Sequence, residues 1–261
     1  MPIETANSDS PKIALVTGAA KRIGKTIALR LAEHGWDVAI HYRSSGAMAE
    51  AVAAEVRLRG RKAMTIEADL AKEAEVEAIV PKVAAQFGPL SLLVNNASTF
   101  EMDKAETVTR ASWDKHIEPN LRAPLVLSQA FARQFHGAHG GNIINLLDQR
   151  VWKPTPYFIS YTIAKMGLWT LTRTLALSYA PRIRVNGIGP GPTLPSPRQS
   201  EEQFAQQSAA MPLGHGATPE EIARAVQFIL ESPSMTGQMI ALDGGEHLGW
   251  QVPGKGYQPK E

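Results

Sequence analysis

Short apolar runs alternate with stretches of helical periodicity along almost the whole chain. Apolar runs occupy residues 13–16, 37–41, 63–67, 90–94, 142–147, 183–188 and 239–242. Helical patterns follow these runs, the first ending at residue 34 and the others over 48–58, 73–87, 113–135, 161–179 and 218–231. The helix over 113–135 can break near Pro119 and Pro124, because a helix interior tolerates proline poorly. Such alternation predicts one α/β domain, a doubly wound parallel sheet of about seven strands with helices on both faces.

The bulk properties exclude several classes of protein. With 261 residues, 44% hydrophobic and 20% charged, the chain is typical of an ordinary globular protein. A net charge of +2 indicates neither a nucleic-acid nor a membrane partner. The absence of cysteine excludes disulfides and thiolate metal sites, and we expect no metal. Residues 1–10 carry no apolar signal core and no run reaches the length of a membrane span, so we expect a cytoplasmic protein.

The expected organisation is a flexible extension over residues 1–10, one domain over 11–250 and a tail over 251–261. Residues 193–212 are rich in Pro, Ser and Gln, which is typical of either a mobile lid or a plain surface excursion.

Polar clusters follow the expected strands at the point where each ends. They occupy residues 17–24, 41–45, 69, 95–100, 148 and 189–193. Ligands of parallel α/β sheets bind outside the carboxyl ends of the strands. The sequence therefore predicts one ligand site built from all of these clusters.

The first two clusters point to a dinucleotide. Residues 17–24 form a glycine-bearing turn that leads into a helix, whose N-terminus offers unpaired N–H groups to a pyrophosphate. The second strand is followed by His-Tyr-Arg-Ser-Ser without an acid, so Arg43 and Ser44, with Lys21, are expected to bind a ribose 2′-phosphate. We therefore predict NADPH/NADP as the cofactor; the alternative is that Arg43 is a solvated loop residue.

A phenol and an amine lie close together at the start of the 161–179 helix. Tyr161 and Lys165 are four residues apart, so their side chains share one helix face. A nearby ammonium favours the phenolate and lowers the phenol pKa, which makes Tyr161 a candidate general acid. Asp148, at the preceding strand end, is expected at the mouth of the same cleft. The alternative is a solvated Tyr-Lys face.

Five motifs in this order resemble the short-chain dehydrogenase/reductase family: Thr17-Gly18 with Gly24, Asn95-Asn96-Ala97, Asn120, Tyr161 with Lys165, and Pro190-Gly191. The resemblance implies a single Rossmann-type domain, and hydride transfer from a nicotinamide cofactor in an enzyme that is usually a homotetramer. It implies that Tyr161 is the proton donor, that Lys165 lowers its pKa and holds the nicotinamide ribose, and that Asn120 positions a water.

Two departures narrow the resemblance. Arg22 replaces the middle glycine of the turn, and Asp148 replaces the usual serine. With residues 41–44 and 96–100, these changes resemble the pteridine and dihydromonapterin reductases. That subgroup implies a small-molecule pterin substrate stacked on Phe100, with Ser98 contacting cofactor and substrate, and protonation by the aspartate, tyrosine and lysine together.

The implied cofactor contacts are Gly18, Lys21, Arg22, Ile23, Gly24, Tyr42, Arg43, Ser44, Asp69, Leu70, Asn96, Ala97, Ser98, Tyr161, Lys165, Pro190, Gly191 and Thr193. The implied substrate contacts are Arg22, Ser98, Phe100, Asp148 and Tyr161.

Simpler interpretations stay open for three of these residues. Phe100 can be folded onto the core, Arg22 can be a solvated turn residue, and Asp148 can be a cap. Two other functions also stay open: a ketone or aldehyde reductase, and a protein that binds NADPH without turnover.

Overall fold

The computed structural model describes residues 11–196 and 198–249, so the expected extension and tail lie outside the described residues. The fold contains a parallel sheet of seven strands in the order β3-β2-β1-β4-β5-β6-β7. The strands are β1 (Ile13–Val16), β2 (Asp37–Tyr42), β3 (Ala63–Glu67), β4 (Leu92–Asn95), β5 (Gly141–Leu146), β6 (Ile183–Pro190) and β7 (Met239–Leu242). Strand order reverses between β1 and β4, and ligands of doubly wound sheets bind at such a switch point.

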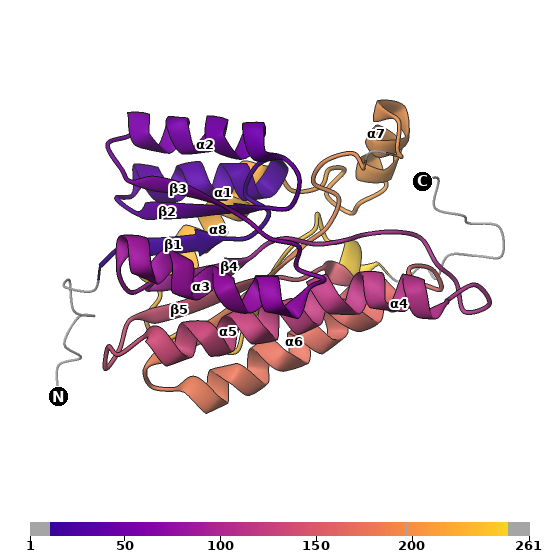
Figure 1. Ribbon diagram of the computed structural model, residues 1–261. Helices are drawn as coiled ribbons and strands as arrows, with labels where there is room; N and C mark the ends of the chain where they lie inside the picture. The colour runs from indigo at the N-terminus through magenta and orange to yellow at the C-terminus, as the bar shows by residue number, and fades with distance from the viewer. Residues whose placement is uncertain (1–10, 197, 250–261) are drawn as a thin grey trace.

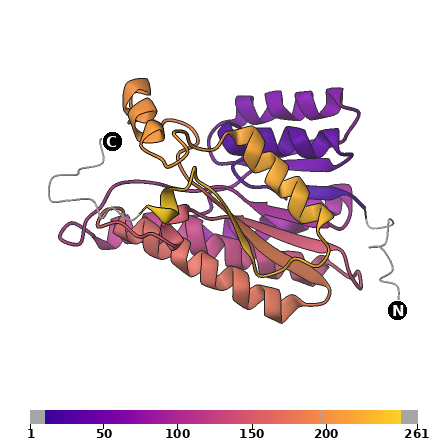
Figure 2. The ribbon, with the colours of Figure 1, turned by 180° about the vertical axis from the view of Figure 1, so that it is seen from behind.

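Helices cover both faces of the sheet, as predicted (Figure 1). One face carries α1 (Arg22–Glu33), α2 (Gly46–Leu58) and α8 (Pro219–Glu231), and Figure 2 shows α8 lying across this face from behind. The other carries α3 (Glu73–Phe87), α5 (Ala123–Gln134) and α6 (Ile159–Tyr179). Side chains of β1 alternate between the two faces, Ala14 and Val16 toward the first and Ile13 and Leu15 toward the second. Two apolar cores therefore sandwich the sheet.

The predicted strands agree with the observed ones to within two residues at each end, and the late start of β4 has a visible cause. The run at 90–94 begins pairing only at Leu92, because the Leu90 backbone is bonded to the Gln134 side chain instead of a strand. Both Leu90 bonds to Gln134 satisfy the backbone groups of a buried residue. The apolar pattern thus identified burial correctly but placed the strand start two residues early.

The predicted helix over 113–135 is interrupted by a wider turn. It consists of α4 (Arg110–Ile117), a π-helical segment (Glu118–Arg122) and α5. Pro119 and Pro124 lie in the first turns of the second and third parts, where a missing N–H costs least. The π segment buries Asn120.

The excursion over 193–212 contains a helix that the sequence did not predict, α7 (Glu201–Ala209). Ser200 caps it by accepting a hydrogen bond from the Gln203 N–H, while the Gln203 side chain bonds back to the Ser200 N–H. No residue of α7 is buried, and the helix stands away from the sheet in both ribbon views. Among the described residues, no helix combines the length and apolarity needed to cross a membrane.

Candidate active site

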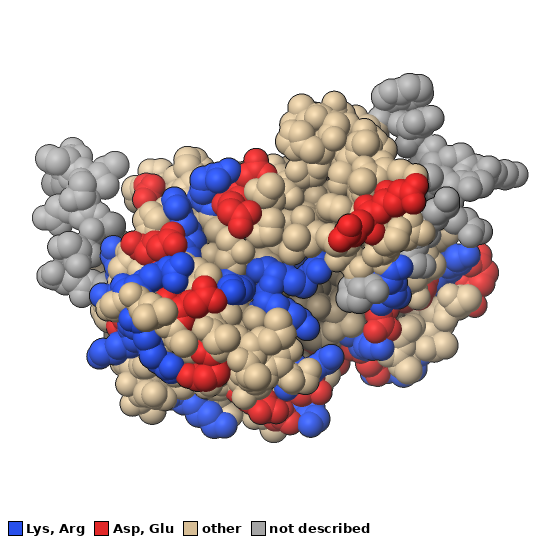
Figure 3. All heavy atoms as spheres, turned by 90° about the horizontal axis from the view of Figure 1, so that it is seen from above, with Lys and Arg blue, Asp and Glu red and all other residues tan. Residues whose placement is uncertain are grey.

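A cavity of about 580 Å³ opens at the carboxyl ends of the strands, where the polar clusters were expected to meet. It is lined by nineteen of the twenty-one residues predicted for the site; Gly24 and Asn120 lie outside its lining. Basic side chains gather near the middle of the face seen in Figure 3. Lys21, Arg22 and Arg43 are exposed residues of the cavity lining, so one end of the cavity is basic.

The glycine turn is packed tightly against the end of β4. A side chain at Gly24 would place its Cβ 2.4 Å from the Gly18 carbonyl oxygen and 2.5 Å from Asn96 Nδ2, so only glycine fits. Asn96 Nδ2 also donates to the Thr17 carbonyl at 2.8 Å. Gly18 and Arg22 both adopt the left-handed region, with φ of +62° and +56°. Arginine therefore occupies a backbone conformation that favours glycine.

His41 supports this turn from beneath. Its Nδ1 accepts a hydrogen bond from the Gly18 N–H at 3.1 Å, and its Nε2 lies 3.1 Å from the Ala68 carbonyl oxygen. These partners require an imidazole that is protonated only at Nε2. Burial lowers the pKa of His41 to about 4. A neutral histidine thus joins the turn after β1 to the end of β3, a structural role that the sequence pattern did not indicate.

The buried His41 predicts a loss of stability in mild acid. Its pKa of about 4 in the folded protein lies below the ordinary 6.5, so the unfolded chain binds the extra proton as pH falls between these values. Stability is therefore full above pH 6.5 and should decrease by about 2 kcal/mol between pH 7.5 and pH 5 through this group. Denaturant unfolding at the two pH values measures the change.

The His41→Gln variant should show a pH dependence smaller by about the same 2 kcal/mol. The matched control is His136→Gln, at an exposed histidine. An equal pH dependence in wild type and His41→Gln would contradict the assignment.

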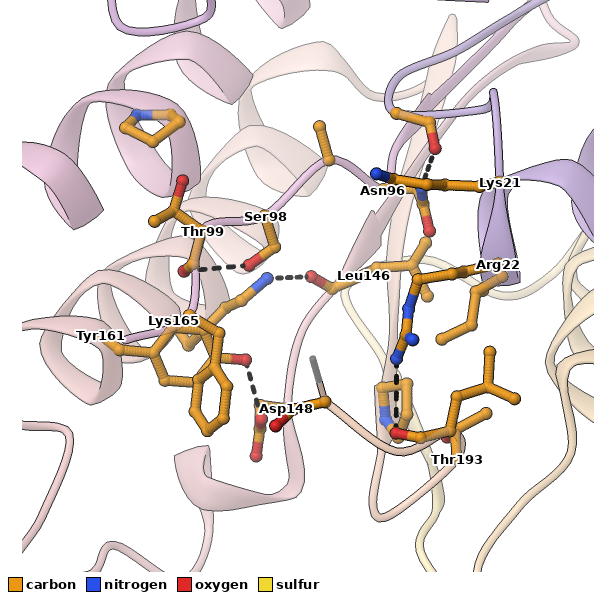
Figure 4. Close-up of a pocket in the computed structure, with 18 of the residues that line it drawn as sticks. Lys21, Arg22, Asn96, Ser98, Thr99, Leu146, Asp148, Tyr161, Lys165 and Thr193 are labelled. Atoms are coloured by element: carbon orange, nitrogen blue, oxygen red, sulfur yellow. Dashed lines mark hydrogen bonds between the residues drawn. The ribbon is translucent and has the colours of Figure 1, made fainter. Parts of the chain in front are cut away.

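Asp148 and Tyr161 meet at the other end of the cavity. Tyr161 Oη donates a hydrogen bond to Asp148 Oδ2 at 2.8 Å (Figure 4). Asp148 also caps the short turn after β5, since its Oδ1 accepts from the Arg150 N–H at 2.8 Å, and Arg150 Nη1 lies 3.3 Å from Oδ2. The capping interpretation and the cavity interpretation of Asp148 are therefore both correct.

The pKa of Tyr161 is raised well above its ordinary value, first by burial and then by the negative charge of Asp148. Tyr161 is 5% exposed. Because the neutral phenol is favoured, Tyr161 carries its proton at neutral pH. The site thus holds a protonated donor hydrogen-bonded to a carboxylate.

The pKa of Tyr161 is raised and not lowered overall, because burial and the Asp148 charge determine it, while the effect of Lys165 itself stays a prediction. Lys165 Nζ donates to the Leu146 carbonyl at 2.7 Å and lies 5.7 Å from the centre of the Tyr161 ring (Figure 4). Burial lowers the pKa of Lys165 itself to about 8. Burial and the Asp148 charge therefore outweigh the ammonium, which sequence spacing alone could not reveal.

Phe100 forms a wall of the cavity and is packed from behind by a second ring. Its ring stacks on Phe158 with centroids 4.5 Å apart and planes 16° apart, and meets Tyr161 edge-on at 4.7 Å. The Arg150 guanidinium carbon lies 5.3 Å from the Phe100 centroid. Phe158 is fully buried and left-handed, with φ of +59°. The ring wall is thus fixed by aromatic packing.

Asn120 lies behind the cavity lining. It is 1% exposed, its Oδ1 accepts from the Thr99 N–H at 2.8 Å, and its Nδ2 donates to the Thr99 carbonyl at 2.8 Å. Both ends of the amide are therefore engaged with one backbone residue. This side chain holds residues 98–100 in place, whereas its expected role toward a water stays a prediction.

Two arginines connect the 193–200 segment to the rest of the site. Arg22 donates to the carbonyls of Pro195, at 2.8 Å, and Leu194, at 3.3 Å. Arg198 Nη2 donates to the Phe100 carbonyl at 2.8 Å. Arg22 is therefore an exposed turn residue whose guanidinium is bonded to this segment.

Sequence reasoning missed Arg150 and Glu246, which also line the cavity. Burial raises the pKa of Glu246 to about 7, with further contributions from the charges of Asp148 and Asp243. Arg150 follows Asp148 by two residues, a spacing that could have indicated a local ion pair. Glu246 is about a hundred residues from Asp148, so no local pattern could have found it.

The chain is similar in sequence to known proteins. Residues 18–247 match a family model described as enoyl-(acyl carrier protein) reductase. The 3-oxoacyl-[acyl-carrier-protein] reductase FabG of Staphylococcus aureus is 34% identical over 242 residues, 91% of this chain and 98% of that protein.

Solved structures are also similar. FolM alternative dihydrofolate reductase 1 from Brucella canis, complexed with NADP, is 46% identical with a TM-score of 0.89, over 93% of this chain and 96% of that one. A blue fluorescent protein from a metagenomic library, in complex with NADPH, is 33% identical with a TM-score of 0.84, over 90% and 97% of the two chains.

Proposed function

Because the chain belongs to the short-chain dehydrogenase/reductase family, we propose that this oxidoreductase is an NADPH-dependent reductase of a dihydropterin. Dihydromonapterin and dihydrobiopterin are the proposed substrate types, with dihydrofolate as a further candidate. The observation that carries the proposal is the Tyr161–Asp148 hydrogen bond of 2.8 Å beside the Phe100 ring wall.

The cavity fits NADPH. The close approach of Gly24 to Gly18 leaves backbone at the α1 N-terminus free of side-chain bulk, as binding of a pyrophosphate requires. Lys21, Arg43 and Ser44 would hold the 2′-phosphate, and Lys165 the nicotinamide ribose. When bound, NADPH supplies the hydride. Similar structures complexed with NADP and NADPH support this assignment.

Cofactor choice predicts a selective defect. Replacing Arg43 by alanine should raise the KM for NADPH by about 10- to 100-fold, because charge-assisted hydrogen bonds to the 2′-phosphate are lost. The KM for NADH should change little. Initial rates with both cofactors measure the effect, with Arg110→Ala, a side chain 85% exposed on α4, as the matched control. Equal defects with the two cofactors would contradict the assignment.

The end of the cavity that holds Asp148 and Tyr161 suits a flat nitrogen heterocycle. A carboxylate accepts hydrogen bonds from ring N–H and amino groups, and Asp148 is half-buried in the cavity lining. Tyr161 holds a proton at Oη and would deliver it to a ring nitrogen. The Lys165 ammonium would then stabilise the phenolate that forms. An aromatic wall at Phe100 favours a stacked ring.

A second candidate is a ketone or aldehyde reductase, favoured by the 34% identity to FabG. Turnover of dihydromonapterin, dihydrobiopterin and dihydrofolate should be compared with that of a panel of simple ketones and a 3-oxoacyl thioester. We expect kcat/KM to be highest for a dihydropterin. A preference for the ketones or the thioester would reject the pterin assignment. Binding of NADPH without any turnover is disfavoured because Asp148, Tyr161 and Lys165 all line the cavity.

We further propose that the protein is cytoplasmic and that residues 193–212 act as a lid over the cavity. We also propose that it forms a homotetramer. Ile163 and Met166 are exposed apolar side chains three residues apart on α6, which favours burial of this part of α6 between subunits. Light scattering coupled to gel filtration measures the assembly state, and a mass other than that of four subunits would reject the homotetramer.

A further inference from the structure

Three polar side chains are buried together behind the Tyr161 side of the cavity. Asp103, which follows β4, is 4% exposed; His116 of α4 is 1% exposed; Ser160 in the first turn of α6 is 0% exposed. None of them lines the cavity. Buried polar groups are costly unless every one is paired. We call these three residues the Asp103 cluster.

The hydrogen-bond partners of the cluster determine which atom carries each proton. His116 Nε2 accepts from the Glu101 N–H at 3.0 Å, so Nε2 carries no proton and the neutral ring must be protonated at Nδ1. Nδ1 lies 2.7 Å from Ser160 Oγ and 3.0 Å from the Ser112 carbonyl oxygen. The Ser160 hydroxyl in turn donates to Asp103 Oδ2, because a carboxylate can only accept. One arrangement of protons therefore satisfies His116, Ser160 and Asp103.

Two residues of this chain of bonds are sequence neighbours of groups in the reaction site. Glu101, bonded to His116, directly follows Phe100, and Ser160 directly precedes Tyr161. The His116 and Tyr161 rings meet edge-on with centroids 6.0 Å apart.

Asp103 also holds the entry into α6. Its Oδ1 accepts from the Ser160 N–H at 3.2 Å, and its carbonyl accepts from the N–H of Phe158, the left-handed residue whose ring supports Phe100. α6 has no side-chain cap of its own at Phe158, so a carboxylate from a distant segment takes that role.

We propose that Asp103, His116 and Ser160 are positioning residues that set the Phe100 ring wall and the Tyr161 phenol relative to each other. The cluster does so only with His116 neutral and protonated at Nδ1, since a proton at Nε2 would oppose the Glu101 N–H. Burial favours the neutral form of His116 by lowering its pKa. The kinetic consequence rests on the proposed function of Tyr161, whereas the protonation pattern does not.

The protonation pattern is tested on the wild-type protein by ¹⁵N NMR of histidine-labelled enzyme at neutral pH. The His116→Gln spectrum identifies the His116 signals. We expect a protonated Nδ1 and an unprotonated Nε2, the reverse of His41. A proton on Nε2 of His116 would overturn the proposal, whatever the substrate proves to be.

The positioning role is tested with Ser160→Ala and Asp103→Asn, which remove bonds with little change of volume. Misplacement of reacting groups by a fraction of an ångström to 1 Å costs about 10- to 100-fold in rate. We therefore expect kcat for the best substrate to fall by about 10- to 100-fold, with the Kd for NADPH unchanged. Ser160→Thr, which restores the hydroxyl, should recover most of kcat. The matched control is Asp114→Asn, a half-buried carboxylate on α4 that pairs with Arg110 and has no bond to the cluster residues.

A lower melting temperature with unchanged kcat in both variants would reduce the cluster to a structural role and overturn the proposal. Because kcat can be followed with a ketone as well as with a dihydropterin, this outcome differs from failure of the pterin assignment. Should Asp103→Asn fail to fold, Ser160→Ala alone decides, since it retains the Asp103 carboxylate and its bond from the Ser160 N–H.

Discussion

Tyr161→Phe should lower kcat by about 10²- to 10⁴-fold, the contribution typical of a positioned general acid. The substitution removes Oη, which carries the proton and donates to Asp148 at 2.8 Å, while keeping the ring that meets Phe100 edge-on. The raised pKa of Tyr161 means that the lost group is the protonated form that reduction requires. The loss of NADPH absorbance with a dihydropterin measures kcat.

Fluorescence titration of NADPH should give nearly the same Kd for Tyr161→Phe and wild type, because the basic residues of the cavity are untouched and only one cofactor contact changes. Tyr179→Phe, at the opposite end of α6, is the matched control and should keep full turnover. Unchanged turnover in Tyr161→Phe would remove this tyrosine from the mechanism.

Asp148→Ser should change the substrate preference as well as the rate. A serine hydroxyl suits a small carbonyl oxygen, whereas the carboxylate accepts hydrogen bonds from ring N–H and amino groups. Loss of such a charged acceptor costs about 1.5–3 kcal/mol, so we expect kcat/KM for a dihydropterin to fall by about 10- to 100-fold. Ketone turnover should be retained. The ratio of the two kcat/KM values is the measurement.

The pH dependence of kcat in Asp148→Ser gives a second test of the role of Asp148. The Asp148 charge raises the pKa of Tyr161, so its removal must lower that pKa. The Asp148 charge also raises the pKa of Lys165, which is about 8 and sets the first alkaline loss of a proton, so the alkaline limb of kcat should move to lower pH. Asp148→Asn removes the charge with little change of side-chain size, and its alkaline limb should move to lower pH in the same way. An unchanged substrate ratio together with an unmoved limb would contradict the assigned role of Asp148.

The sequence alone identified the sheet and the edge that carries the site. Alternating apolar runs and helical patterns permit little besides a parallel sheet covered on both faces, and polar clusters at strand ends then meet at one edge. Asp148 and Tyr161 were expected in one cleft on this basis, and they are hydrogen-bonded there. Local sequence carries this information because strand ends in a parallel sheet share an edge.

The tertiary structure alone decided how those residues act on each other. Burial raised the pKa of Tyr161, although the spacing to Lys165 suggested the opposite, because desolvation depends on everything that surrounds a group. Asn120 engages the Thr99 backbone, and Arg22 is bonded to the carbonyl of Pro195, 173 residues away. Sequence spacing records which residues share an element, whereas hydrogen bonds and burial depend on distances between elements that only the folded chain defines.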